Sequence, residues 1–179
     1  HLLASEPKGH PDPLDVNAPV IMQSEKVRKV YNTQYGSFFK RKNYELVAVD
    51  DISSIVRRGE TLGIVGESGS GKTTLAMSLV RLQETTSGTI SFDGQRIDNL
   101  DRAAMRPFRT RIQVVFQDPF SSLNPRMIVR QILEEGLIVN GIGKNAAERE
   151  ELIKQALADV QMPADAMQRF PHEFSGGQR

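Results

Sequence analysis

The 179-residue sequence has no cysteine, no tryptophan and no apolar run of the roughly 18 residues that a membrane-spanning helix requires. The lack of cysteine excludes a disulfide framework, a thiol nucleophile and a thiolate metal site. The formal net charge of +1 indicates no strongly acidic or basic partner. With 39% hydrophobic and 25% charged residues, the remaining composition is that of an ordinary globular chain that can bury a core.

The order of the hydrophobic patterns predicts three parts. Residues 1–19 are rich in proline and are interpreted as a linker, 20–125 as a strand-rich subdomain, and 126–179 as a helical subdomain. Strands are expected at 20–31, 48–56, 61–66 and 112–116, the last two as buried parallel strands, and a hairpin around the Asp-Gly of 87–97. Helices are expected at 72–81, within 101–109, and at 127–139 and 146–160, and the last should present one apolar face made of Leu152, Ile153, Ala156, Leu157 and Val160. The polar stretch between the first two strands reads as a surface loop.

The stretch "GESGSGKTT" matches the phosphate-loop pattern G-x-x-x-x-G-K-[ST], and it has the apolar strand before it and the helix after it that this motif requires. Such a loop turns its N–H groups toward a phosphate at the start of a helix, where the helix dipole favours negative charge. The residues expected to bind nucleotide here are Gly66, Glu67, Ser68, Gly69, Ser70, Gly71, Lys72, Thr73 and Thr74. Lys72 would contact the β- and γ-phosphates, and the Thr73 hydroxyl would ligate Mg²⁺.

Two further segments carry weaker signals. Gln117 follows the strand predicted at 112–116, at the sheet edge where ligands of doubly wound folds bind, although alone it reads as a plain loop glutamine. The final "FSGGQR" offers a second glycine-rich anion site through Ser175, Gly176, Gly177 and Gln178. Alone it reads as a loop glycine pair. Because one domain rarely needs two sites for one γ-phosphate, the economical interpretation is that this site serves a nucleotide held by another copy.

Taken together, these segments resemble the nucleotide-binding domains of ATP-binding cassette (ABC) transporters. "GESGSGKTT" is similar to the Walker A motif, "VVFQDP" to the Q-loop and "FSGGQ" to the signature motif, with Phe174 where Leu is commoner. The wording of "VGESGSGKTT", "QDPFSSLNPR" and "FPHEFSGGQR" resembles the branch that powers peptide importers, over residues 20 to 179.

The resemblance implies an α/β fold of the P-loop NTPase type: a mixed core sheet with an antiparallel β edge and a helical signature subdomain. It implies ATP and Mg²⁺ as ligands, with Thr73 and Gln117 at the metal and Lys72 and Gln117 in catalytic roles. Tyr31 would stack on adenine, with Tyr44 as the fallback. It further implies transmembrane permease subunits and a second ATPase domain as partners, no nucleic acid, and a place on the cytoplasmic face of the plasma membrane.

The sequence departs from the family pattern after the signature motif. The Walker B aspartate, the catalytic glutamate and the switch histidine that the family places downstream have no counterpart here, and neither do the C-terminal strands. We therefore expect these residues alone not to hydrolyse ATP and to aggregate or be partly ordered. The start of the chain resembles the end of another cassette, which suggests a tandem protein, with a simple N-terminal linker as the alternative. A non-catalytic nucleotide-binding module and a small-molecule phosphotransferase are the alternatives.

Overall fold

The computed structural model describes residues 13–35, 42–116 and 123–174. The chain divides into two compact units, residues 1–107 and 108–179. Each unit is described separately below. The linker at 1–19 and the subdomain boundary expected near residue 125 remain predictions.

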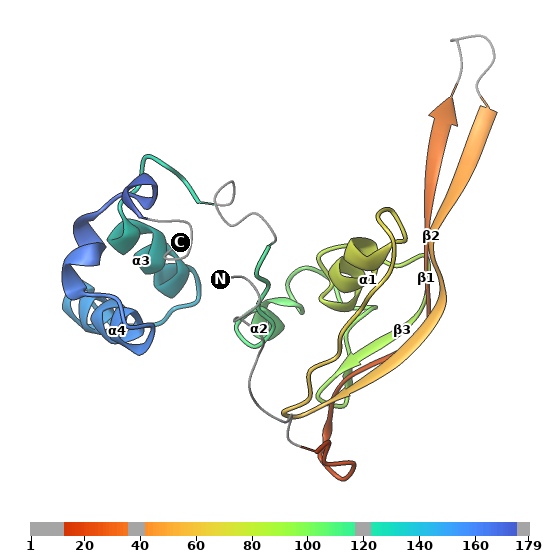
Figure 1. Ribbon diagram of the computed structural model, residues 1–179, viewed down its shortest axis with the longest axis horizontal. Coiled ribbons are helices and arrows are strands. Elements are labelled where there is room, and N and C mark those ends of the chain that lie inside the picture. The colour runs from red at the N-terminus through yellow and green to blue at the C-terminus, as the bar shows by residue number, and fades with distance from the viewer. Residues whose placement is uncertain (1–12, 36–41, 117–122, 175–179) are drawn as a thin grey trace, which may run out of the picture. The chain divides into compact units, whose positions relative to one another are not determined.

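The first unit contains a four-stranded antiparallel sheet (Figure 1). Its strands are β1 (Val20–Tyr35), β2 (Lys42–Arg57), β3 (Ser87–Phe92) and β4 (Gln95–Arg96), in the order β2-β1-β3-β4. The central strand β1 pairs with β2 along almost its whole length and with β3 over its first half. The antiparallel β edge predicted from the sequence is thus confirmed.

A two-residue turn joins β3 to β4, as the Asp-Gly pair predicted. Phe92 pairs with Gln95, which leaves Asp93 and Gly94 as the turn. Both have positive φ, 51° and 77°, which is the requirement of the type I′ turn that suits the right-handed twist of paired strands. The two residues of the turn therefore explain why the hairpin forms at this position.

The β1–β2 hairpin extends further than the sequence suggested. The polar stretch predicted as a surface loop continues the two strands, since Thr33 pairs with Tyr44 and Tyr35 with Lys42. The Thr33 hydroxyl adds a bond to the Tyr44 carbonyl at 3.3 Å. The loop prediction was wrong here because backbone pairing tolerates polar side chains on a solvated hairpin.

The two buried parallel strands predicted at 61–66 and 112–116 are a second correction. Neither segment forms a strand, and both carry exposed apolar side chains, such as Val65 at 93% and Val115 at 91%. A parallel strand is stabilised only by neighbours that pair with it and by layers that cover its faces. None of the described residues pairs with either segment.

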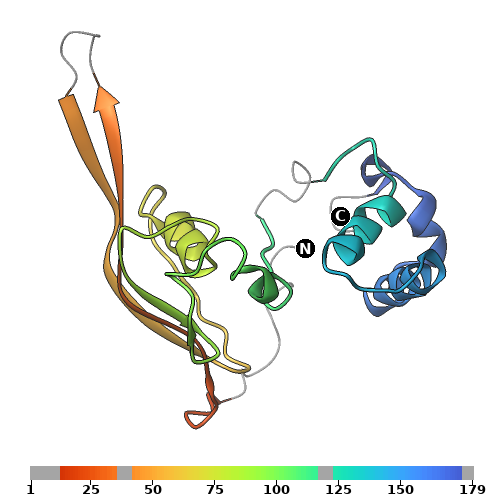
Figure 2. The ribbon, with the colours of Figure 1, turned by 180° about the vertical axis from the view of Figure 1, so that it is seen from behind.

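Helix α1 (Lys72–Leu79) lies against the sheet and contacts both β1 and β2 (Figure 2). It confirms the helix predicted at 72–81 to within two residues. The single turn α2 (Arg106–Arg109) corresponds to the short helix expected in 101–109. The buried apolar residues of the first unit are Val27, Val49, Leu79, Ile90, Phe92, Ile97 and Met105.

The second unit is helical, with α3 (Val129–Val139), α4 (Ala146–Asp159) and the 3₁₀ turns η2 (Ala164–Gln168) and η3 (Pro171–Glu173). Its core consists of Ile153, Leu157, Ala166, Met167 and Phe174. Asn145 caps α4 by accepting the Glu148 N–H at 2.9 Å.

The apolar face predicted for α4 is narrower than expected. Only Ile153 and Leu157 of that face are buried, while Leu152, Ala156 and Val160 are exposed. The helices predicted at 127–139 and 146–160 are otherwise confirmed, because the helical spacing of apolar residues was correct even where only part of the face is covered.

Candidate phosphate-binding site

The glycine-rich loop passes directly into α1, as the motif requires. Gly71 is the N-cap of the helix and has a left-handed backbone, with φ 88° and ψ 4°. A Cβ at this position would lie 2.0 Å from the carbonyl oxygen of Ala48 in β2. The loop therefore rests on the backbone of β2, and only glycine allows both the φ angle and the close approach.

The Lys72 side chain bends back over the loop. Its Nζ donates to the carbonyl oxygens of Gly66 at 2.8 Å and Glu67 at 2.5 Å, and lies 3.4 Å from the Ser70 hydroxyl. These three oxygen atoms are uncharged, so they solvate the ammonium without neutralising it. The loop thus holds a positive charge beside the N-terminus of a helix, where anions are favoured.

A pocket of about 310 Å³ lies between this loop and β2. Its lining combines the loop with apolar side chains, and consists of Ala48, Val49, Asp50, Ile52, Ile64, Val65, Gly66, Ser70, Gly71, Lys72 and Leu75. Thr73 is exposed and Thr74 half-buried in the first turn of α1. A polyanion at the helix start, with an apolar group beside it, fits this lining.

Tyr31, expected to stack on a base, lies on β1 opposite Leu46. Its hydroxyl accepts a hydrogen bond from the Gln83 side chain, and the Nζ of Lys29 lies 5.1 Å from its ring centroid. The fallback Tyr44 is 63% exposed. Neither Gln83 nor Lys29 was singled out in the sequence. Gln83 is 52 positions from Tyr31, and no local pattern marks a contact over that separation.

The remaining predicted site residues, Gln117 and Ser175 to Gln178, lie outside the described residues. The residue before them, Phe174, is 5% exposed in the core of the second unit. The guanidinium of Arg169 lies 4.2 Å from the Phe174 ring centroid. The segment that leads into the signature motif is thus fixed by packing.

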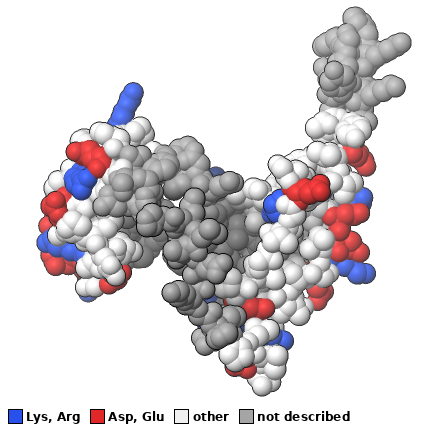
Figure 3. Space-filling view, in the orientation of Figure 1, with Lys and Arg blue, Asp and Glu red and all other residues white. Residues whose placement is uncertain are grey.

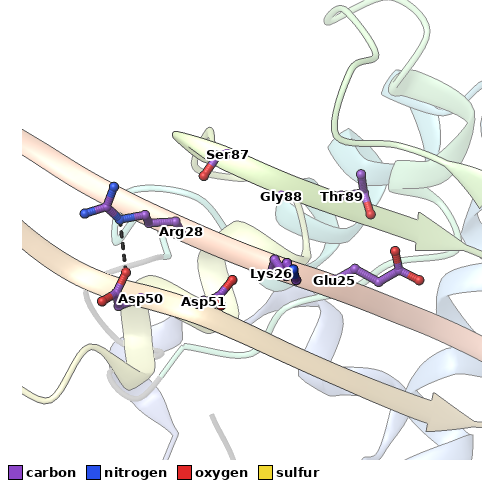
Figure 4. Close-up of a pocket in the computed structure, with 8 residues that line it drawn as sticks. All are labelled: Glu25, Lys26, Arg28, Asp50, Asp51, Ser87, Gly88 and Thr89. Carbon is purple, nitrogen blue, oxygen red and sulfur yellow. Dashed lines mark ion pairs between the residues drawn. The ribbon is translucent and has the colours of Figure 1, made fainter.

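A second hollow of the first unit, about 650 Å³, lies beside bulges of the sheet (Figure 4). It is lined by Glu25, Lys26, Arg28, Asp50, Asp51, Ser87, Gly88 and Thr89. Arg28 and Asp50 face each other across β1 and β2 at 3.0 Å. Its charges are of both signs and partly paired, so no single class of ligand is indicated.

Charge elsewhere is mixed as well. Figure 3 shows basic and acidic side chains interspersed on the visible face. Among the described residues, no three His, Asp or Glu side chains are grouped as metal ligands. Within the same residues, no helix is both long and apolar enough to cross a membrane.

A glycine-rich loop that seats on a strand, opens a helix and encloses a lysine defines the class of P-loop proteins. The comparisons then give the family. A family model described as "ABC transporter" matches residues 49–179, and the chain belongs to this family.

The curated relatives share this family, and several have transport in their names. The chain is 47% identical over 179 residues to the peptidoglycan transport ATP-binding protein YejF of Agrobacterium fabrum, covering 100% of this chain and 32% of that protein. It is 43% identical over 164 residues to the oligopeptide transport ATP-binding protein AppF of Bacillus subtilis, covering 91% and 49%. The chain thus spans about a third of the first relative's length and about half of the second's.

Among solved structures, the chain is similar to the ATP-binding cassette MJ0796 in a dimeric post-hydrolysis state bound to ADP and Pi. The TM-score is 0.70 at 24% identity, covering 88% of this chain and 65% of that one. This similarity shows the fold, which is that of an ABC cassette.

Proposed function

We propose that the chain is the ATP-binding part of an ABC importer, in which ATP binding and hydrolysis are coupled to the uptake of peptides or similar small solutes. The observation that carries the proposal is the Lys72 ammonium, held by uncharged loop oxygens at the start of α1. The names of the relatives support the transport role and the class of solute.

In this proposal, phosphate binding replaces the hydrogen bonds that the Lys72 ammonium makes within the loop. The ammonium leaves the carbonyls of Gly66 and Glu67 for the β- and γ-phosphates, and the loop N–H groups and the α1 N-terminus supply the remaining donors. The contact of Gly71 with Ala48 holds the loop in place during this exchange. The Thr73 hydroxyl and Gln117 would hold Mg²⁺, which neutralises charge that develops on the phosphates.

The second anion site acts on another copy. In this proposal Ser175, Gly176, Gly177 and Gln178 donate to the γ-phosphate of a nucleotide bound by a partner ATPase domain, so ATP closes the dimer and hydrolysis reopens it. Phe174, which directly precedes these donors in the sequence, is buried in the core of the helical unit. Permease subunits, contacted after Gln117, place the protein at the cytoplasmic face of the membrane.

The test measures ATP affinity and ATP-dependent dimerisation of the intact protein that carries this sequence. Lys72→Ala is expected to abolish ATP binding, and Ser175→Arg to leave monomer binding nearly intact while blocking dimerisation. The control is Lys154→Ala, at a half-buried lysine of α4 that pairs with Glu150 and Glu151, and it should match the wild type in both assays.

Two results would contradict the proposal. If Lys72→Ala binds ATP as the Lys154→Ala control does, the phosphate site is wrong. If Ser175→Arg weakens monomer binding as much as Lys72→Ala does, the assignment to a partner's nucleotide is wrong. ATP binding without phosphate release from the intact protein would instead identify a non-catalytic module.

A further inference from the structure

The hydroxyl of Tyr31 is bonded by a residue far away in the sequence. Gln83, just after α1, donates its side-chain N–H to this hydroxyl. The backbone N–H of Gln83 in turn donates to the Met77 carbonyl of α1 at 3.1 Å, so its position is fixed by the helix. The Tyr31 ring is therefore tied to the same helix that begins at the phosphate loop.

Tyr31 lies at a distance from the loop that a nucleotide can span. It pairs with Leu46, and Ala48, on which Gly71 rests, is two residues further along β2. Two residues of a strand correspond to roughly 7 Å. A nucleotide with its phosphates in the loop therefore brings its base into the neighbourhood of this ring.

The ring has a cation near it as well. The Nζ of Lys29 lies 5.1 Å from the Tyr31 centroid, within the roughly 6 Å range of a cation–π contact. The Tyr31 side chain therefore has two contacts before any ligand binds: its hydroxyl with Gln83 and its ring with Lys29. A half-buried ring held in this way loses little freedom on stacking.

We propose that Gln83 is a positioning residue for the base: it fixes the Tyr31 ring in the orientation that stacks on adenine, with Lys29 as a secondary support. This rests on the proposed function, since it assumes a nucleotide at the loop. It goes further by assigning affinity for the base to a residue outside every motif of the sequence.

The experiment compares two probes on the intact protein, ATP and inorganic tripolyphosphate, by equilibrium competition against a fluorescent ATP analogue. Gln83→Leu and Tyr31→Phe each remove one partner of the bond and should weaken ATP binding roughly three- to tenfold. The double variant should weaken it no further than either single variant, because both remove the same interaction. Tripolyphosphate, which has no base, should bind all three variants as it binds the wild type.

Gln83→Glu should restore ATP affinity, because the phenol O–H can donate to a carboxylate. The matched control is Gln155→Leu, which removes an exposed glutamine of α4 and should change neither probe. The inference is overturned if Gln83→Leu weakens both probes, which indicates a structural role, or neither. Lys72→Ala separates the two claims: it should abolish binding of both probes, and if it does not, the proposed function itself fails.

Discussion

The close approach of Gly71 to the Ala48 backbone in β2 predicts a measurable loss of stability when Gly71 gains a side chain. Gly71→Ala introduces a Cβ 2.0 Å from the Ala48 carbonyl oxygen, well inside the 3.0 Å that real Cβ contacts respect, and in a backbone with φ 88°. The left-handed conformation costs about 1–2 kcal/mol for a residue with a side chain. Relieving the overlap moves the helix start away from the strand and costs about 1–3 kcal/mol more.

The matched control is Gly59→Ala, at a turn with φ 76° and open space around the new methyl group. It should lose only the strain of about 1–2 kcal/mol, which leaves a difference of about 1–3 kcal/mol for Gly71→Ala. Thermal unfolding without nucleotide would show this as a melting temperature lower by roughly 2–4 °C per kcal/mol. Equal melting temperatures for the two variants would refute the inference that the loop is seated on β2.

Three further changes test the sheet and the helical unit. Ser24 is buried, and its hydroxyl accepts a hydrogen bond from the Ser54 N–H at 3.0 Å. Ser24→Ala should therefore lower the free energy of unfolding by about 1–3 kcal/mol in denaturant titrations, whereas the same change at an exposed serine should lower it little. Burial raises the pKa of the Asp98 carboxyl. Hydrogen bonds from the Arg96 guanidinium and the Ile90 N–H lower this pKa by more than burial raises it, so the net shift is downward. Ionised Asp98 therefore contributes about 1 kcal/mol to the free energy of unfolding. This contribution is present above the unfolded pKa of about 3.9 and is lost as the pH falls through the folded pKa. The stability difference between the wild type and Asp98→Asn should shrink between pH 6 and pH 3, and a constant difference would contradict this. Asn145→Ala removes the cap of α4 and should lower unfolding stability by about 1 kcal/mol, with Asn145→Asp retaining most of it.

Local chemistry explains why much of the fold and the local geometry of the glycine-rich loop could be predicted. Lys72 bonds to oxygens five and six residues away in its own loop, and Gly71 opens the helix with a left-handed backbone, so the sequence pattern predicts these features. The contact of Gly71 with Ala48 in β2 depends on the fold and is not part of that pattern. The Asp93-Gly94 turn is determined locally, by the two positive φ angles that these residues tolerate. The bond between Gln83 and Tyr31 depends instead on how α1 packs on the sheet, and no spacing in the sequence encodes it.

The predicted parallel strands failed for a different physical reason, and this leads to a last prediction. An apolar run such as residues 61–66 reports a need for burial and does not report which partner supplies it. Val65 is 93% exposed, and no described residue pairs with this run, whereas β1 is paired on both sides over its first half. Backbone amides that are not hydrogen-bonded within a sheet exchange with solvent through small local openings. In hydrogen exchange of this 179-residue chain, the amides of 61–66 should therefore exchange far faster than those of 22–25 in β1. Comparable protection of the two segments would mean that the apolar run finds a partner in solution, and the strand prediction would then be right after all.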